Sequence, residues 1–240
     1  MIEYIGKCLF IEEGKAKKKE RILVIGDLHL GYEETLNASG IFVSREMFRE
    51  MIDEMQRVFD KTGKVDKVVL LGDVKHKFGG ILRQEWNDVL SLFEFLKKKC
   101  KEIIITKGNH DIILEPIVRK VKGVRLVEYF IWKEYCFVHG NKKFEEIIKN
   151  KDIKCIIMGH VHPAVEISDG VKNEKYKCFL IGRFGKREMI LVPSFFSLIE
   201  GTDPRESHLK EIWNININNF KVKVVNGLEV LDFGGLGDLK

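Results

Sequence analysis

Short apolar runs, rich in β-branched residues, alternate with polar segments through the first two thirds of this 240-residue chain. Five of the runs end directly in glycine or in polar side chains, which is the sequence signal of a buried strand. These five runs are residues 22–25, 68–71, 103–106, 136–138 and 155–158. Residues 9–13 precede the first run and predict a strand beside it, with the polar segment 14–20 as a charged turn.

Two segments between these strands carry apolar residues at helical spacing. Residues 45–61 predict one helix, with Ser44 as its N-cap and Gly63 beyond its end. Its inner face combines methionine, aromatic and aliphatic side chains, namely Met47, Phe48, Met51, Ile52, Met55, Val58 and Phe59. Residues 84–99 predict a second helix with a similar apolar face. We interpret both stripes as surfaces that pack against the core.

The pattern changes after residue 163, where closely spaced strands replace the alternation of strands and helices. Turn signals separate most of these strands, which we predict at residues 165–168, 176–182, 188–192, 212–217, 221–225 and 229–233. A βα-rich half over about residues 1–163, then an antiparallel β-rich half over about 164–233, predicts an α/β (α+β, four-layer) fold. Two mixed β-sheets should pack as a sandwich with helices on the outer faces.

No internal repeat or low-complexity linker divides the sequence, so we expect a single domain over residues 1–240. Residues 234–240 are rich in glycine but lack the following helix and the Lys-Ser/Thr pair of a phosphate-binding loop. We therefore expect these last residues to form a flexible tail.

The composition, with 45% hydrophobic and 32% charged residues, is typical of soluble globular proteins. No apolar stretch reaches the ~18 residues of a membrane span, and the first residues lack the order of a signal peptide. We therefore expect a cytoplasmic protein without membrane contact. The five cysteines form no CxxC pair, and we interpret them as buried structural residues.

The net charge of +5 would suit an anionic partner. However, the lysine runs 17–19 and 97–99 fall at a predicted turn and a predicted helix end, where lysine complements the helix dipole. A solvated lysine face is therefore favoured over a nucleic-acid footprint. The oligomeric state stays open, and a homodimer is one option.

Each of the five strand-like runs is followed at once by side chains that ligate metals. The five motifs are Gly26-Asp27-Leu28-His29, Gly72-Asp73, Gly108-Asn109-His110-Asp111, His139-Gly140 and Gly159-His160-Val161-His162. Six of the seven histidines lie in or next to them. If the strands share a sheet, their ends bring these groups to one edge, where ligands bind in open α/β sheets. Carboxylate, amide oxygen and imidazole together suit divalent cations such as Mn²⁺.

In this order the motifs resemble the D-x-H, G-D, G-N-H-D/E, H and G-H-x-H pattern of the calcineurin-like metallophosphoesterases. The resemblance covers about residues 21–163. Within that superfamily, residues 26–33, 71–76 and 159–163 are similar to the archaeal branch related to SbcD-type DNA repair nucleases.

The resemblance implies two divalent metal ions that share one ligand. The ligands of the first would be Asp27, His29, Asp73 and His162. Those of the second would be Asp73, Asn109, His139 and His160. Two cations about 3.5–4 Å apart need a shared anion, and a water that bridges them is acidified to a hydroxide that attacks phosphorus. We expect manganese, with iron, zinc, nickel or magnesium as alternatives.

The other residues in and beside the motifs have either a role implied by the resemblance or two alternative roles. By resemblance, His110 would protonate the leaving oxygen or hydrogen-bond the transition state, so that it and Asp73 are the catalytic residues. Asp111 is either a carboxylate that fixes an imidazole tautomer or an N-cap. Lys75 and His76 either contact the substrate phosphate or are solvated. His208, in a polar segment, is left out of the site.

The leading hypothesis is a dinuclear phosphodiesterase acting on nucleic acid or a nucleotide, and the subfamily resemblance favours a nuclease in DNA repair. A phosphomonoesterase or a small cyclic or nucleotide phosphodiesterase is the alternative enzyme. A scaffold that keeps the fold without catalysis is the alternative of another class, but every position of the pattern is intact. The shape of the substrate groove depends on segments 31–44, 75–83 and 202–210, which the sequence suggests are loops.

Overall fold

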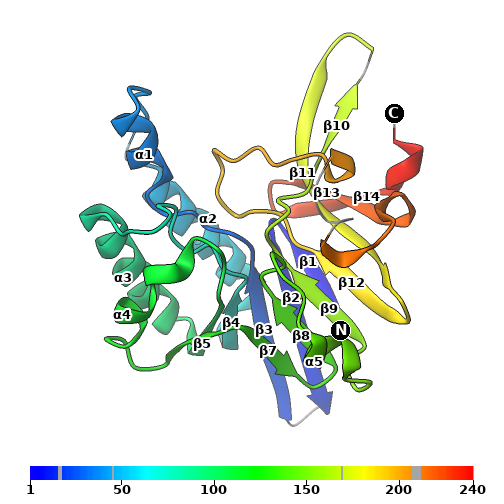
Figure 1. Ribbon diagram of the computed structural model, residues 1–240, viewed down its shortest axis with the longest axis horizontal. Coiled ribbons are helices and arrows are strands. Elements are labelled where there is room, and N and C mark those ends of the chain that lie inside the picture. The colour runs from blue at the N-terminus through cyan, green and yellow to red at the C-terminus, as the bar shows by residue number, and fades with distance from the viewer. Residues whose placement is uncertain (16–17, 45, 169, 207–211, 240) are drawn as a thin grey trace.

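Two β-sheets packed face to face form the centre of the computed structural model, which describes residues 1–15, 18–44, 46–168, 170–206 and 212–239 (Figure 1). The first sheet has six strands in the order β1-β2-β3-β4-β5-β6. Its strands are β1 (Ile2–Ile5), β2 (Cys8–Lys15), β3 (Lys18–Ile25), β4 (Val65–Leu70), β5 (Cys100–Thr106) and β6 (Val124–Val127). The pairs β1–β2 and β2–β3 are antiparallel, whereas β3 to β6 run parallel.

The second sheet is also mixed and follows the order β14-β13-β11-β12-β9-β8-β7, with β10 paired to β11. Its strands are β7 (Tyr129–Trp132), β8 (Tyr135–Val138), β9 (Cys155–Met158), β10 (Ala164–Ser168), β11 (Asn173–Phe184), β12 (Arg187–Leu191), β13 (Lys221–Asn226) and β14 (Glu229–Gly235). The pairs β8–β9 and β9–β12 are parallel, and the other pairs are antiparallel. The prediction of two mixed sheets in a sandwich is confirmed.

Alternate residues of most strands fill the space between the sheets. Leu9 and Val24 of the first sheet are buried there with Phe137, Ile157 and Ile190 of the second. Their neighbours along β3, such as Leu23, point to the opposite face, toward the helices. Burial on both faces explains why these strands appear in the sequence as unbroken apolar runs.

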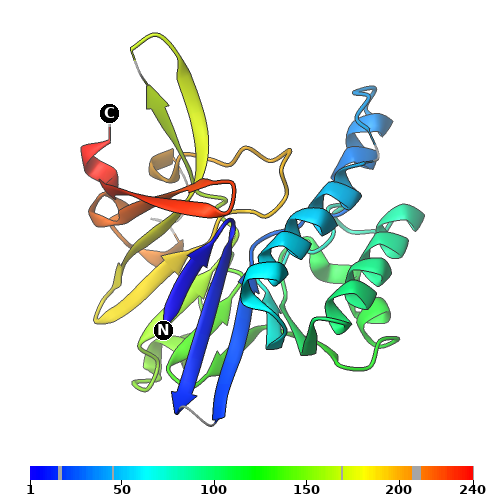
Figure 2. The ribbon, with the colours of Figure 1, turned by 180° about the vertical axis from the view of Figure 1, so that it is seen from behind.

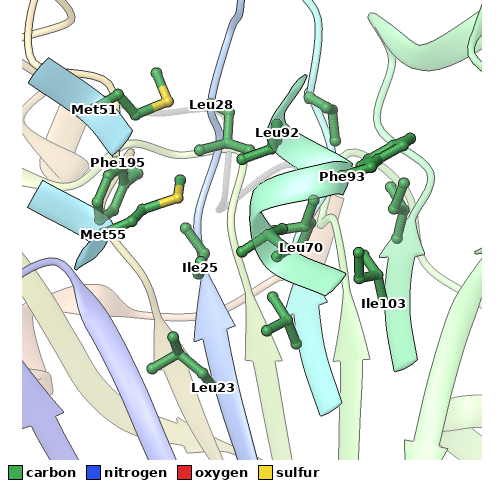
Figure 3. Close-up of a cluster of buried hydrophobic side chains, with 14 of the residues drawn as sticks. Leu23, Ile25, Leu28, Met51, Met55, Leu70, Leu92, Phe93, Ile103 and Phe195 are labelled. Carbon is green, nitrogen blue, oxygen red and sulfur yellow. The ribbon is translucent and has the colours of Figure 1, made fainter. Parts of the chain in front are cut away.

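Helices cover the outer face of the first sheet. They are α2 (Met47–Thr62), α3 (Arg83–Lys97) and α4 (Glu115–Val118), and Figure 2 shows α2 beside β1 to β3. Helix α1 (Tyr32–Ala38) extends beyond the end of the sheet (Figure 1). Met51 and Met55 of α2 and Phe93 of α3 pack on the strands, as Figure 3 shows. Both predicted apolar stripes therefore face the core. The side chain of Ser44 does not cap α2, which begins after Glu46.

Short elements cover the outer face of the second sheet. They are α5 (Glu145–Lys149) and the 3-10 turns η3 (Ile217–Asn219) and η4 (Leu236–Asp238), while η1 (Asp111–Ile113) and η2 (Pro204–Glu206) lie in the connecting loops. Ile147 of α5, Trp213 and Leu236 are buried in this third cluster of apolar residues. Across the described residues, none of the helices is both long enough and apolar enough to cross a membrane.

The predicted strand at residues 212–217 is wrong. Its apolar residues alternate, and Trp213, Ile215 and Ile217 are indeed buried, but Asn214 between them has a left-handed φ of 51°. The segment therefore turns and enters η3, laying its apolar side chains on the sheet without joining it. Alternating apolar and polar residues indicate which side chains are buried. An irregular segment that packs on a sheet can show the same alternation as a strand.

Three further boundaries differ from the sequence prediction. Strands β2 and β3 continue through the expected turn and pair as far as Lys15 and Lys18, so that only residues 16–17, outside the described residues, connect them. The expected loop 31–44 contains α1. The expected tail is wrong for residues 234–239, because Gly235 ends β14 and the buried Leu236 donates its N–H to Phe220 O. Lys240 lies outside the described residues.

Candidate metal centre

The five motifs follow strands of both sheets and meet at one end of the sandwich. Asp27, Asp73 and Asn109 come after β3, β4 and β5, which are parallel neighbours in the first sheet. His139 and His160 come after β8 and β9, which are parallel neighbours in the second. A hydrogen bond joins the two sets, since the carboxylate of Asp27 accepts the N–H of His160 at 3.0 Å.

Left-handed backbone conformations aim several of these side chains. The φ angles are 45° at His29, 45° at Asp73, 67° at His160 and 49° at His162. Such angles at residues other than glycine cost roughly 1–3 kcal/mol each and cluster at functional sites. Main-chain bonds hold the His29 and Asp73 turns together, because the N–H groups of Leu28 and His29 both donate to Asp73 O, at 3.1 and 2.8 Å.

The first group of donors consists of Asp27, His29 and His162, whose ligand atoms lie within 4.8 Å of one another. His162 Nε2 is 3.2 Å from Asp27 Oδ1 and 3.3 Å from His29 Nε2. The lone pairs of two imidazoles and one carboxylate can therefore converge on a single point.

The second group consists of Asp73, His139 and His160, again within 4.8 Å. His139 Nδ1 lies 2.7 Å from Leu71 O, so a proton on Nδ1 is donated to that carbonyl. In this tautomer His139 Nε2 carries a lone pair and no proton. It nevertheless faces two oxygen acceptors, Asn109 Oδ1 at 3.1 Å and Asp73 Oδ2 at 3.5 Å. Three lone pairs that face one another fit a cation between them.

Asp73 lies between the two groups. Its Oδ2 is 4.0 Å from His29 Nε2 on one side and 3.5 Å from His139 Nε2 on the other. Its Oδ1 accepts the N–H of His110 at 2.9 Å. This is the position that a ligand shared between two metal ions would take.

Burial makes the charge of both aspartates costly. Asp27 is 0% and Asp73 2% exposed, and the ion-pair partners found for them among the described residues are all histidines. A buried carboxylate needs a compensating charge. Burial raises the pKa of Asp73, whereas at Asp27 burial is outweighed by His162, His139 and His29, which lower its pKa. Divalent cations would supply the missing charge.

The imidazoles are suited to that role. Burial, aided by the neighbouring histidines, lowers the pKa of His29 to about 2 and that of His160 to about 4. Both rings are therefore neutral at pH 7, which is the form that binds metals. Carboxylates, imidazoles and the Asn109 amide oxygen form a donor set that divalent cations accept, so the residues fit the implied pair of metals.

The chain matches the calcineurin-like phosphoesterase family model over residues 20–138. The matched stretch holds the first three of the five motifs. The resemblance to the SbcD-type branch stays a prediction. No curated protein matches the chain.

Among solved structures, the nuclease MPE of Pseudomonas putida is similar over 92% of this chain and 100% of its own, with 14% identity and a TM-score of 0.58. That likeness shows the fold. A protein of unknown function, AQ665 of Aquifex aeolicus, is 18% identical over 59% of this chain and 78% of its own, with a TM-score of 0.40. Zinc-bound Vps29 of Entamoeba histolytica is 17% identical over 87% and 88%, with a TM-score of 0.36.

The ring of the histidine next to Asn109 is held by a main-chain group. His110 Nδ1 bonds to the carbonyl of His76, so its Nε2 is the nitrogen left to face the metal groups. Nε2 lies 4.0 Å from Asp73 Oδ2, and the His110 side chain is 22% exposed, so a substrate can reach it.

Asp111 connects the Gly72-Asp73 and Gly108-Asn109 motifs through backbone groups. It is fully buried, and its oxygens accept the N–H groups of Val74 and Gly108, each at 3.0 Å. Burial and the nearby Asp73 raise its pKa to about 6. It therefore positions the residues beside Asp73 and Asn109, in place of the imidazole contact or the N-cap suggested by the sequence.

The weaker candidates have different surroundings from those expected. Lys75 is 0% exposed and donates to Lys77 O, so it is neither solvated nor open to a substrate phosphate. His76 is half-buried, with its Nδ1 3.4 Å from His29 Nδ1 and its ring stacked on His110 at 5.3 Å between centroids. His29, His76 and His110 form a third group of donors within 4.8 Å. His208 lies outside the described residues.

Sequence reasoning missed Glu85, a fully buried carboxylate of α3. It accepts the N–H groups of His76, Lys77 and Leu82, at 3.2, 2.6 and 2.7 Å. A glutamate three residues after the start of a helix is a capping-box signal, and this could have indicated part of its role. Its bonds to the His76 segment leave no trace in the sequence.

Two lysines were missed as well. Lys7 donates to Phe195 O at 2.6 Å, and Lys177 donates to Ser194 O and Ser194 Oγ, each at 2.9 Å. Phe195 in turn donates its N–H to Asp27 O at 2.9 Å. The lysines therefore hold the loop that supports Asp27.

Proposed function

We propose that this protein is a dinuclear, metal-dependent phosphodiesterase that hydrolyses nucleic acid or a nucleotide. The observation that carries the proposal is the position of the buried Asp73 between two groups of donors. If the two buried aspartates had only a structural role, lysine or arginine side chains would be expected to balance their charge. Among the described residues, their ion-pair partners are histidines instead.

Two divalent cations, when bound, supply Lewis acidity at the phosphoryl oxygens and lower the pKa of a water nucleophile. Asp73 holds its carboxylate between the two positions, and His139 keeps a lone pair toward the second because Leu71 O holds its Nδ1. His110 would donate a proton from Nε2 to the leaving oxygen when its ring is doubly protonated, while its Nδ1–H stays bonded to the His76 carbonyl. These contacts hold the donors in place before a substrate arrives.

Several finer assignments form part of this proposal. Manganese is the proposed metal, because the donors are oxygen and imidazole without thiolate. DNA is the proposed polymer, on the resemblance to SbcD-type nucleases and on the fold shared with the nuclease MPE. A cytoplasmic location and a single domain over residues 1–240 stay predictions from the sequence.

The test loads the purified protein with Mn²⁺ and compares a chromogenic diester, a chromogenic monoester, and single- and double-stranded DNA. Asp73→Asn is the critical variant, and bound metal is counted by mass spectrometry. Asp66→Asn is the matched control, because Asp66 lies near the other end of β4 and pairs with Lys101.

We expect the Asp73→Asn variant to lose bound metal and diester hydrolysis together, while Asp66→Asn keeps both. Hydrolysis that survives Asp73→Asn would contradict the dinuclear mechanism. A preference for the monoester without any cleavage of DNA would contradict the nuclease assignment and favour a phosphomonoesterase. Metal binding without hydrolysis of any ester would favour the non-catalytic scaffold.

A further inference from the structure

The segment from His76 to Phe78 lies directly beside the candidate proton donor. The ring of Phe78 meets that of His110 edge to face, with centroids 5.6 Å apart and planes at 89°. Phe78 is nevertheless 63% exposed. A single exposed aromatic side chain is ordinary on a protein surface. Phe78 differs because its position relative to His110 is fixed.

Two buried charged side chains hold this segment from opposite sides. Glu85 accepts the N–H of Lys77 at 2.6 Å, and the ammonium of Lys75 donates to the carbonyl of the same residue. Glu85 and Lys75 are both 0% exposed. Burying charges is costly, and it persists where bonds such as these compensate. The backbone just before Phe78 is therefore fixed at both its N–H and its carbonyl.

Gly31 makes room for this arrangement. A Cβ atom added to it would lie 2.2 Å from Glu85 Cγ, and its φ of 85° is one that glycine adopts without strain. His76 completes the connection, because its carbonyl bonds to His110 Nδ1 and its ring stacks on the His110 ring. The same short segment thus orients His110 and presents Phe78 next to it.

We infer that Phe78 binds the part of the substrate that departs, by stacking on a nucleobase of the leaving nucleoside. This rests on the proposed function, in which His110 meets the leaving oxygen. The nucleoside attached to that oxygen would then lie against the exposed ring of Phe78. Stacking of a base on an aromatic side chain strengthens binding roughly 5- to 150-fold and tolerates any base. The substrate class is therefore a phosphodiester with a nucleoside leaving group.

The experiment compares Phe78→Ala and Phe78→Trp with the wild-type protein loaded with Mn²⁺. Phe233→Ala is the matched control, because Phe233 is also an exposed phenylalanine but belongs to β14, in the second sheet. The substrates are a dinucleotide and two versions of it, one without its 5′ base and one without its 3′ base. Product analysis identifies the nucleoside that leaves.

We expect Phe78→Ala to lower kcat/KM about tenfold on the complete dinucleotide, and several-fold less on the version that lacks the leaving base. Phe78→Trp should restore the rate, and Phe233→Ala should not change it. Equal losses on the complete dinucleotide and on that version, or no loss on either, would overturn the role of Phe78 while leaving hydrolysis intact. A wild-type protein that cleaves no phosphodiester would overturn the proposed function itself.

A binding measurement tests the same contact without catalysis. Fluorescence anisotropy of a single-stranded 12-nucleotide probe with the metal-free protein is compared with that of an abasic probe of equal length. Phe78→Ala should weaken binding of the normal probe by about tenfold and reduce the difference between the probes. Parallel losses on both probes would contradict base stacking. A tenfold effect on the dinucleotide alone would identify a small nucleotide as the substrate.

Discussion

At the scale of single residues, the site depends on which nitrogen or oxygen each side chain presents. His139 and His110 are both held through Nδ1 by carbonyl groups, Leu71 O and His76 O, so each directs Nε2 toward the aspartates. By resemblance, the sequence predicts His139 as a ligand and His110 as a proton donor, but it does not predict the carbonyl groups that orient the two rings. Both Nε2 atoms lie near the central carboxylate, at 3.5 Å for His139 and 4.0 Å for His110 from Asp73 Oδ2.

His110→Asn should slow the chemical step while leaving the metals in place. General acid catalysis contributes roughly 10² to 10⁴ in rate, so we expect kcat on a dinucleotide to fall by about that factor. A p-nitrophenyl ester, whose leaving group departs without a proton, should lose far less. Steady-state rates and metal counts on the same samples check this prediction. A similar loss on both esters would show that His110 does not protonate the leaving oxygen.

Glu85→Ala should destabilise the protein, because it leaves the N–H groups of His76, Lys77 and Leu82 without their acceptor. Each buried donor without a partner costs about 1–3 kcal/mol, so the free energy of unfolding should fall by at least that amount. Urea titration of the metal-free protein measures it. Glu94→Ala on the exposed face of α3 is the control and should change stability by less than about 0.5 kcal/mol.

At the scale of elements, the sequence predicts those strands whose position depends on a local run of apolar residues. The strands before Asp27, Asp73 and Asn109 are visible in the sequence because burial on both faces requires an apolar run and the motif follows it at once. The strand predicted at residues 212–217 is wrong, because alternate burial of Trp213 and Ile215 also occurs in an irregular segment packed on a sheet. The bonds from Glu85 to the His76 segment and from Asp111 to Val74 could not be predicted, since they depend on how the intervening loops fold.

Trp213→Ala tests the irregular segment at residues 212–217. Trp213 is 0% exposed, and its Nε1 donates to Gly140 O at 2.9 Å, next to His139. Removing a buried tryptophan side chain costs about 3–5 kcal/mol, so we expect a loss of that size in the free energy of unfolding. Leu231→Ala on the neighbouring strand β14, where Leu231 is 44% exposed, should cost far less. Equal losses of stability in the two variants would mean that packing of residues 212–217 on the second sheet does not stabilise the fold.

At the scale of the whole molecule, residues 194–197 connect the two sheets to the metal centre through Lys7 and Lys177. Burial, with Lys7 nearby, lowers the pKa of Lys177 to about 7. An unfolded lysine titrates near ~10.4, so between about pH 7 and 10 the unfolded chain binds more protons at this position. Lys177 therefore makes the folded state relatively more stable as the pH rises through that range.

Lys177→Met should remove that contribution. We expect the difference in stability between wild type and variant to shift in favour of the wild type when the pH is raised from about 7 to 9.5. Chemical denaturation of both metal-free proteins at the two pH values measures it. Lys175→Met, at an exposed position two residues earlier, should show no such dependence. A difference that does not change with pH would mean that Lys177 keeps an ordinary pKa.

The bond between the carboxylate of Asp27 and the N–H of His160 crosses from one sheet to the other. If one sheet slid along the other by a single residue, the donors would separate by about 3.3 Å, more than the whole ~2.1 Å length of a metal–nitrogen bond. The donor groups of the candidate metal centre therefore meet only when the two sheets are aligned as they are here. Side chains between the sheets, such as Phe137 and Ile190, are constrained by that alignment as well as by stability, although neither belongs to the metal centre.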